Sequence, residues 1–135
     1  MQVHDLKGRL SEVKRDTDLL RTILLHIEDD PKMDGRRYFG FARPEDLDIS
    51  GYSEDEFVYH MRLLISQGFL NGNGDTLPLS VAGLTWEGHE FLDNIRNDSV
   101  WSSTKKRVGD LVGSVSISVI AAVAEAEMKK LIGLK

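Results

Sequence analysis

One stretch of the chain, residues 53–70, restricts its fold more than any other. Ser53 is followed three residues later by Glu56, which is the spacing of a capping box at the start of a helix. Apolar residues then recur at helical spacing, and Gly68 offers the left-handed conformation that commonly ends a helix. An apolar segment begins directly afterwards at Phe69. We therefore predict a short helix that leads straight into a β-strand.

A hairpin and another helix are expected next. Residues 72–75 have the sequence Gly-Asn-Gly-Asp, which is typical of a turn, and residues 77–85 are predicted to return as a second strand. Thr85 can cap the following helix. Trp86 opens that helix, and we expect its side chain in the core. Together the two strands predict a β-hairpin wing.

The first helix is predicted over residues 6–29. Apolar residues and one threonine recur there at alternating steps of four and three, which is a heptad pattern: Leu6, Leu10, Val13, Thr17, Leu20, Leu24 and Ile27. A break near Ser11 is an alternative, with Ser11 or Asp16 as the N-cap. Pro31 ends the element, because the residue before a proline avoids the helical conformation.

The remaining segments complete the order of elements. Residues 37–42 are predicted as a short strand, and residues 44–49 as a short helix, with an extended segment as the alternative. More helix is expected after residue 98, closed by Gly113, and a last helix over residues 116–132, ended by Gly133. This order predicts a mainly α (α+β) fold, a winged helix-turn-helix with a small β-hairpin wing and added C-terminal helices.

The same order suggests three parts. Residues 1–13 are expected to form an N-terminal helical extension and residues 14–98 the winged helix-turn-helix core. Residues 99–135 are expected to form C-terminal helices that pack on the core or make a dimer contact. A chain of 135 residues is long enough for one domain with a hydrophobic core.

Several stretches resemble one protein family of bacteria and phages whose function is unknown. They are Lys14-Arg15-Asp16 with Asp18-Leu19-Leu20-Arg21, Gly51-Tyr52-Ser53 with Tyr59-His60, and the run GLTWEGHEFLD at residues 83–93. The resemblance covers residues 14–133 and is most specific in the last run. It implies a winged-helix-like fold and supplies no catalytic residues.

Composition excludes several kinds of chemistry. The chain has no cysteine, so disulfides, zinc–thiolate sites and cysteine nucleophiles are ruled out. Motifs for nucleotide binding, acyl transfer or zinc hydrolysis are missing from the sequence, and the spacing of His26, His60 and His89 among carboxylates is not that of a metal site. We expect no enzymatic activity, no metal and no cofactor. The sequence contains neither a secretory signal nor a membrane span, so we expect a cytoplasmic protein.

Charge separates the two remaining functions. The net charge is −5, and residues 44–98 alone carry eleven acidic and two basic side chains, a net charge of −9. The favoured hypothesis is a non-enzymatic regulatory or adaptor protein that binds a basic protein partner through an acidic helix face: Glu54, Asp55, Glu56, Tyr59 and Arg62. The alternative is a dimeric DNA-binding regulator that contacts phosphates through Arg36, Arg37, Lys105, Lys106 and Arg107, with Arg43 grouped with Arg36 and Arg37.

A homodimer is a further possibility. One stripe of the last predicted helix is apolar and could contact a second copy: Ile117, Ile120, Ala124, Met128 and Leu131. Docking of this stripe on its own domain is the alternative. The sequence leaves the partner and the oligomeric state open.

Overall fold

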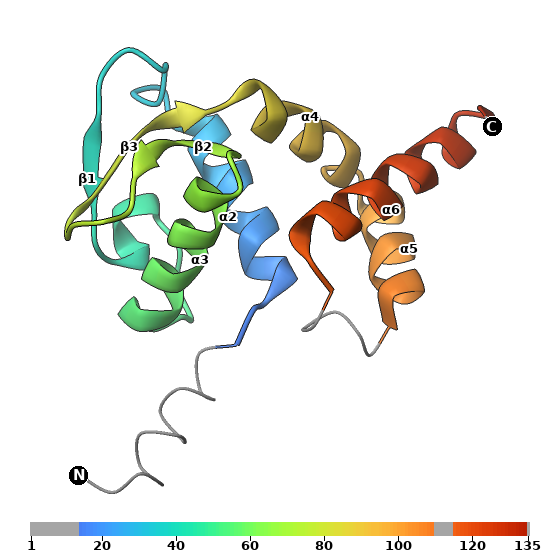
Figure 1. Ribbon diagram of the computed structural model, residues 1–135, viewed down its shortest axis with the longest axis horizontal. Coiled ribbons are helices and arrows are strands. Elements are labelled where there is room, and N and C mark those ends of the chain that lie inside the picture. The colour runs from blue at the N-terminus through green and yellow to red at the C-terminus, as the bar shows by residue number, and fades with distance from the viewer. Residues whose placement is uncertain (1–13, 110–114, 135) are drawn as a thin grey trace, which may run out of the picture.

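The computed structural model describes residues 14–109 and 115–134 of the chain. In that part the protein is mainly helical, with a small antiparallel sheet (Figure 1). The elements are α2 (Thr17–Asp29), β1 (Phe39–Phe41), the 3-10 helix η1 (Pro44–Leu47), α3 (Glu54–Ser66), β2 (Leu70–Asn73), β3 (Leu79–Leu84), α4 (Trp86–Ile95), α5 (Asp98–Val108) and α6 (Ile117–Leu131). None of the described helices is long and apolar enough to span a membrane.

Helix α2 begins later than the continuous helix predicted over residues 6–29. Residues 14–16 are not helical, so that prediction is wrong there, and the alternative with Asp16 as N-cap is confirmed. The carboxylate of Asp16 accepts hydrogen bonds from the N–H groups of Asp18 and Leu19, which would otherwise lack partners. The heptad positions before residue 14 lie outside the described residues.

The short elements between α2 and α3 follow the prediction. Strand β1 lies within residues 37–42, and the favoured helix over residues 44–49 is a 3-10 helix. The Asp46 carboxylate accepts hydrogen bonds from the N–H groups of Ala42 and Arg43, which fixes the chain between β1 and η1. The Ala42 bond is the main cause that lowers the pKa of Asp46.

The three strands pair in the order β1-β3-β2. Phe39 lies opposite Val81, and Leu70 lies opposite Leu84. The predicted second strand begins two residues late, at Leu79, because Pro78 has no N–H group to donate to the ladder. The hairpin is therefore confirmed with a longer turn than the sequence indicated.

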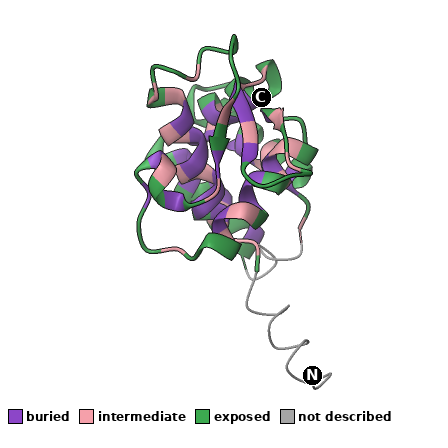
Figure 2. Cartoon of the chain, turned by 90° about the vertical axis from the view of Figure 1, so that its left-hand side faces the viewer, coloured by how far each residue is buried: buried purple, intermediate pink, exposed green. Residues whose placement is uncertain are grey.

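The core forms where α2, α3 and α4 meet the sheet (Figure 2). The expected burial of Trp86 is wrong, since 73% of its surface is exposed. The buried face of α4 is instead Gly88, Phe91, Leu92 and Ile95. A β-carbon at Gly88 would collide with the carbonyl oxygen of Phe69, so the helix approaches the hairpin through its backbone. Trp86 lies two residues away, which is on the other side of the helix.

The C-terminal helices pack on the rest of the chain. Helix α5 ends at Val108, and Gly109 follows with a φ of 59°; Gly113, the predicted end, lies outside the described residues. Helix α6 begins after its N-cap Ser116, as predicted, and packs against α4 and α5 (Figure 1). Trp101 on α5 is buried, and its Nε1 donates to the Asp18 carboxylate at 2.7 Å, which joins α5 to α2.

Candidate macromolecule-binding surface

The start of α3 presents carboxylates to solvent. The predicted capping box is present: the Glu56 N–H donates to Ser53 Oγ at 3.1 Å, and the Ser53 N–H donates to Glu56 Oε1 at 2.9 Å. Glu56 is thereby held against the helix end, whereas Glu54 and Asp55 are exposed and have no ion pair among the described residues. The predicted acidic face therefore consists of two exposed carboxylates and one capping carboxylate.

Tyr59 and Arg62 continue this surface toward the hairpin. The Tyr59 side chain is partly exposed, at 36%. Arg62 lies over the hairpin turn, and its Nε donates to the carbonyl oxygen of Gly74 at 2.7 Å. Gly74 allows this approach, because a β-carbon there would lie 3.1 Å from Arg62 Cγ. The cation at this surface thus has a structural partner in the turn.

A hollow separates α3 from the hairpin. Its volume is about 620 Å³, and its lining is formed by Arg62, Ile65, Ser66, Gly72, Asn73, Gly74 and Asp75. Asp75 is exposed at the turn, and its N–H donates to the Asn73 side chain at 2.8 Å. This hollow offers one guanidinium and one carboxylate, so it has no strong preference for an anion.

His60 connects the start of α3 to the start of α2. It is fully buried, its Nδ1–H donates to the carbonyl oxygen of Glu56 at 2.7 Å, and its Nε2 accepts from the Asp16 N–H at 2.7 Å. Burial lowers the pKa of His60, so the neutral ring predominates at neutral pH. The ring therefore joins the start of α3 to the start of α2.

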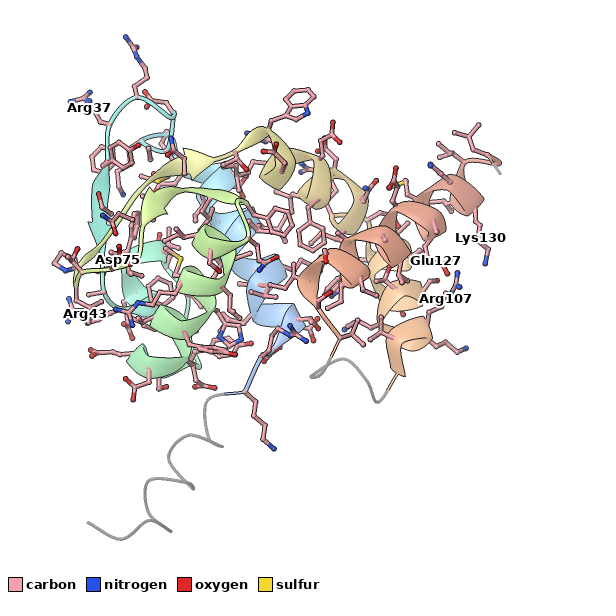
Figure 3. All side chains as sticks on the ribbon, in the orientation of Figure 1. Arg37, Arg43, Asp75, Arg107, Glu127 and Lys130 are labelled. Atoms are coloured by element: carbon pink, nitrogen blue, oxygen red, sulfur yellow. The ribbon has the colours of Figure 1, made fainter. Side chains whose placement is uncertain are left out.

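The predicted phosphate contacts do not lie together. Figure 3 shows Arg37 and Arg107 at opposite ends of the molecule. Lys105 donates to the Asp18 carboxylate, and Arg107 pairs with Glu127, so both cations are already neutralised within the chain. These hydrogen bonds also explain Asp18: burial raises its pKa, but bonds from Trp101 and Lys105 outweigh that effect and lower it. Lys106 is exposed.

The region around β1 holds the other predicted cations. Arg36 and Arg37 are exposed in the segment before β1, and Arg43 is exposed directly after it. Among the described residues, none of these three side chains makes a hydrogen bond or an ion pair. The sequence grouped Arg43 with Arg36 and Arg37 as candidate phosphate contacts, and the structure places the three before and after β1.

The predicted dimer stripe is divided along α6. Ile117, Ile120 and Ala124 are buried within the chain itself. Met128 is half-buried and Leu131 is 55% exposed, since α6 extends past the start of α5 (Figure 1). A contact between two copies could therefore use only the C-terminal end of the stripe.

The three histidines in the described part of the chain do not form a common site. His60 is buried between α2 and α3, His26 contacts the carbonyl oxygen of Leu47 at 2.7 Å through its Nδ1, and His89 is exposed on α4. Within residues 14–109 and 115–134, no group of three histidine or carboxylate side chains could hold a metal ion.

Comparison with known proteins identifies the family. Residues 14–115 match the family described as Hypothetical protein (DUF2513). The chain belongs to this family. A protein of Haemophilus influenzae, named only as uncharacterized, is 32% identical over 124 residues, which is 89% of this chain and 99% of that protein. No solved structure matches the chain. The resemblance found in the sequence to a family of unknown function is thus confirmed.

Proposed function

We propose that the protein is a non-enzymatic winged helix-turn-helix adaptor or regulator that binds a basic protein partner through the start of α3. The fold assignment is supported by the order helix, strand, short helix, helix, hairpin, together with the strand order β1-β3-β2. In helix-turn-helix proteins that bind DNA, the second helix of the motif contacts the bases, and α3 is the helix in that position here.

The charge of the reading surface is the observation that carries the proposal. Helix α3 and the hairpin turn present Glu54, Asp55 and Asp75 as exposed carboxylates, whereas Arg62, the cation among them, is bonded to the turn. A carboxylate 6 Å from a phosphate costs about 3 kcal/mol at an effective dielectric constant near 20, before salt screening. The same carboxylates would attract the lysines and arginines of a basic protein surface, whereas they repel the phosphates of DNA.

DNA binding is the second candidate, and the fold is its main support. A winged helix-turn-helix commonly reads the major groove, and Lys and Arg contacts to phosphates supply most of the affinity. The separation of Arg37 from Arg107 weighs against it, because one duplex segment would have to contact both ends of the molecule (Figure 3). A dimer would not remove the carboxylates from the reading helix.

The double change Glu54→Lys with Asp55→Lys tests the proposal. It spares Glu56, which is needed for the capping box. The proposal expects the wild-type protein to capture a basic protein from a Haemophilus influenzae lysate, and the variant to lose it. It also expects no binding of wild-type protein to random duplex DNA at about 50 mM salt, where non-specific binding is favoured.

The matched control is Glu87→Lys with Glu90→Lys. These two exposed residues lie on α4 near its start, so the net charge changes equally while α3 is untouched. The control should keep the captured protein. Micromolar binding of wild-type protein to duplex DNA, tightened by the α3 change and weakened steeply by salt, would overturn the proposal in favour of the DNA-binding regulator.

A further inference from the structure

A second surface lies at the edge of the sheet. Strand β1 pairs with β3 alone, because the strand order is β1-β3-β2, and Figure 1 shows it on the outside of the molecule. In an antiparallel strand, alternate residues direct their N–H and C=O groups away from the neighbouring strand. No main-chain group outside the sheet bonds to Phe39–Phe41 in the part of the chain that the structure describes. This edge can therefore accept another strand.

Three arginines flank this edge. Arg36 and Arg37 precede β1 and Arg43 follows it, and Figure 3 shows Arg37 and Arg43 toward opposite ends of the strand. All three side chains are exposed and make no hydrogen bond or ion pair among the described residues. By contrast, Arg21 pairs with Asp98, and Arg96 forms a bidentate pair with Glu28. No carboxylate is hydrogen-bonded to these three side chains in the described part of the chain, although Asp46 lies close enough to Arg43 for an electrostatic interaction.

Tyr38 precedes β1, but its hydroxyl bonds to Asn71 of β2, on the other side of β3, so its ring is directed away from the open edge. It is 57% exposed, and its hydroxyl donates to Asn71 Oδ1 at 3.0 Å, which restrains the ring. Phe39 and Phe41 belong to the core region, with Phe41 only 1% exposed. They are not free to stack on bases, so the edge lacks the row of aromatic rings that single-stranded nucleic acid uses.

We propose that β1 binds an acidic, extended segment of a partner protein, which adds to the sheet as a fourth strand. Its main chain pairs with the open edge, and its carboxylates meet Arg36, Arg37 and Arg43. A second copy of β1 is disfavoured, because it would bring like charges together. This surface is separate from the acidic start of α3 and does not depend on the function proposed for it.

A designed peptide tests both parts of the recognition. The probe is a fluorescein-labelled peptide, Glu-Glu-Val-Thr-Val-Glu-Glu, titrated against the full chain by anisotropy. The first comparison peptide replaces each Glu by Lys. The second keeps the charges but carries N-methyl groups on alternate residues, which blocks their N–H donors. We expect binding of the acidic peptide alone.

Charge-reversed proteins locate the contact. Arg37→Glu with Arg43→Glu should weaken binding of the acidic peptide at least about tenfold, since it replaces two attractive pairs by two repulsive ones. The matched control is Lys14→Glu with Lys106→Glu, which alters the net charge equally and leaves β1 intact. It should bind as the wild-type protein does. Thermal unfolding of both variants checks that these surface changes leave the fold unaffected.

Several results would overturn the inference. Equal binding of the N-methylated peptide would exclude strand addition, and equal loss in both charge variants would exclude the β1 edge. No binding of the acidic peptide at about 1 mM would remove the surface as a peptide site. Binding of random duplex DNA that depends on Arg37 and Arg43, without peptide binding, would assign the arginines to phosphates instead.

Discussion

Helices α3 and α4 begin in the same way chemically but in different surroundings. A hydroxyl side chain caps each: Ser53 accepts from the Glu56 N–H, and Thr85 accepts from the Gly88 N–H. The third helical residue differs, because at α3 it is a glutamate that completes a capping box, whereas at α4 it is a glycine. One helix starts toward solvent and the other starts against the hairpin backbone.

This difference explains where each helix can meet a partner. At α3 the side chains stabilise the helix end locally, so Glu54 and Asp55 stay exposed and available. At α4 the close approach of Gly88 to Phe69 uses the helix start for packing, and the Thr85 hydroxyl also donates to the carbonyl oxygen of Gly68. A hydroxyl cap thus belongs to an exposed surface at α3 and to a packed junction at α4.

The largest effect at the two helix starts is expected at Gly88. Gly88→Ala places a β-carbon against the Phe69 carbonyl, and the helix or the hairpin must move. We expect the free energy of unfolding to fall by about 3 kcal/mol, as is typical of overpacked sites. Urea unfolding measures it. Glu87→Ala, one residue away and exposed, is the control and should change stability by less than about 0.5 kcal/mol. Similar values for both would remove the distinction between the two helix starts.

Lowering the pH should destabilise the contact between the starts of α2 and α3, because it protonates His60. Its pKa in the folded protein lies below the ordinary value of 6.5 because it is buried, so the unfolded chain binds a proton first as the pH falls. Stability from this group is complete above about pH 6.5 and decreases as the pH falls from there to the lowered pKa.

The measurement is the free energy of unfolding across this pH range, with His60→Gln as the non-titrating variant. The neighbouring charged groups are Asp16 and Glu56, which favour the protonated ring, and Arg15, which opposes it. The pKa values of Glu28 and Asp46 are lowered, so these carboxylates lose their contributions at more acidic pH than free carboxylates would. An unchanged pH dependence in the variant would contradict the role of His60.

Removing the two caps compares the helix starts directly. Ser53→Ala and Thr85→Ala should each cost about 1 kcal/mol of stability. We expect the larger loss for Thr85, because its hydroxyl both caps α4 and donates to Gly68, while Ser53 makes only the cap. Thermal or urea unfolding of both variants gives the ranking. A larger loss of stability for Ser53→Ala than for Thr85→Ala would contradict the role of the Thr85 hydroxyl in joining α4 to the hairpin.

The smallest effect is expected at Trp86. Because 73% of its surface is exposed, Trp86→Ala should change the free energy of unfolding by less than about 0.5 kcal/mol. Trp101→Ala is the contrast: that ring is buried and bonded to Asp18, so its loss should cost about 3 kcal/mol or more. Equal losses of unfolding free energy for the two variants would mean that the Trp86 side chain is buried in solution.

Local signals were predicted well from the sequence. The capping box at Ser53, the stop at Gly68, the cap at Thr85 and the N-cap alternative at Asp16 each involve residues within a few positions of one another. Their geometry is set by short-range hydrogen bonding, which a sequence pattern encodes directly. The same holds for the acidic character of the α3 start, since its charges are adjacent in the chain.

Features that depend on distant neighbours were missed. Helical spacing could not decide which face of α4 is buried, because Trp86 and Gly88 are both compatible with a packed helix and only the position of Phe69 chooses between them. Likewise, no sequence pattern separates Arg37 and Arg43 from Arg107. Those relations depend on where β1 and α5 lie in the folded chain.

The sequence by itself determined the element types, the caps of α3 and α4 and the local charge of this protein, because each depends on interactions between near neighbours. Only the tertiary structure decided which cations are neutralised, which tryptophan is exposed and which strand lies at the edge of the sheet. Burial and ion pairing join residues many positions apart, and their partners are fixed by packing of the whole core.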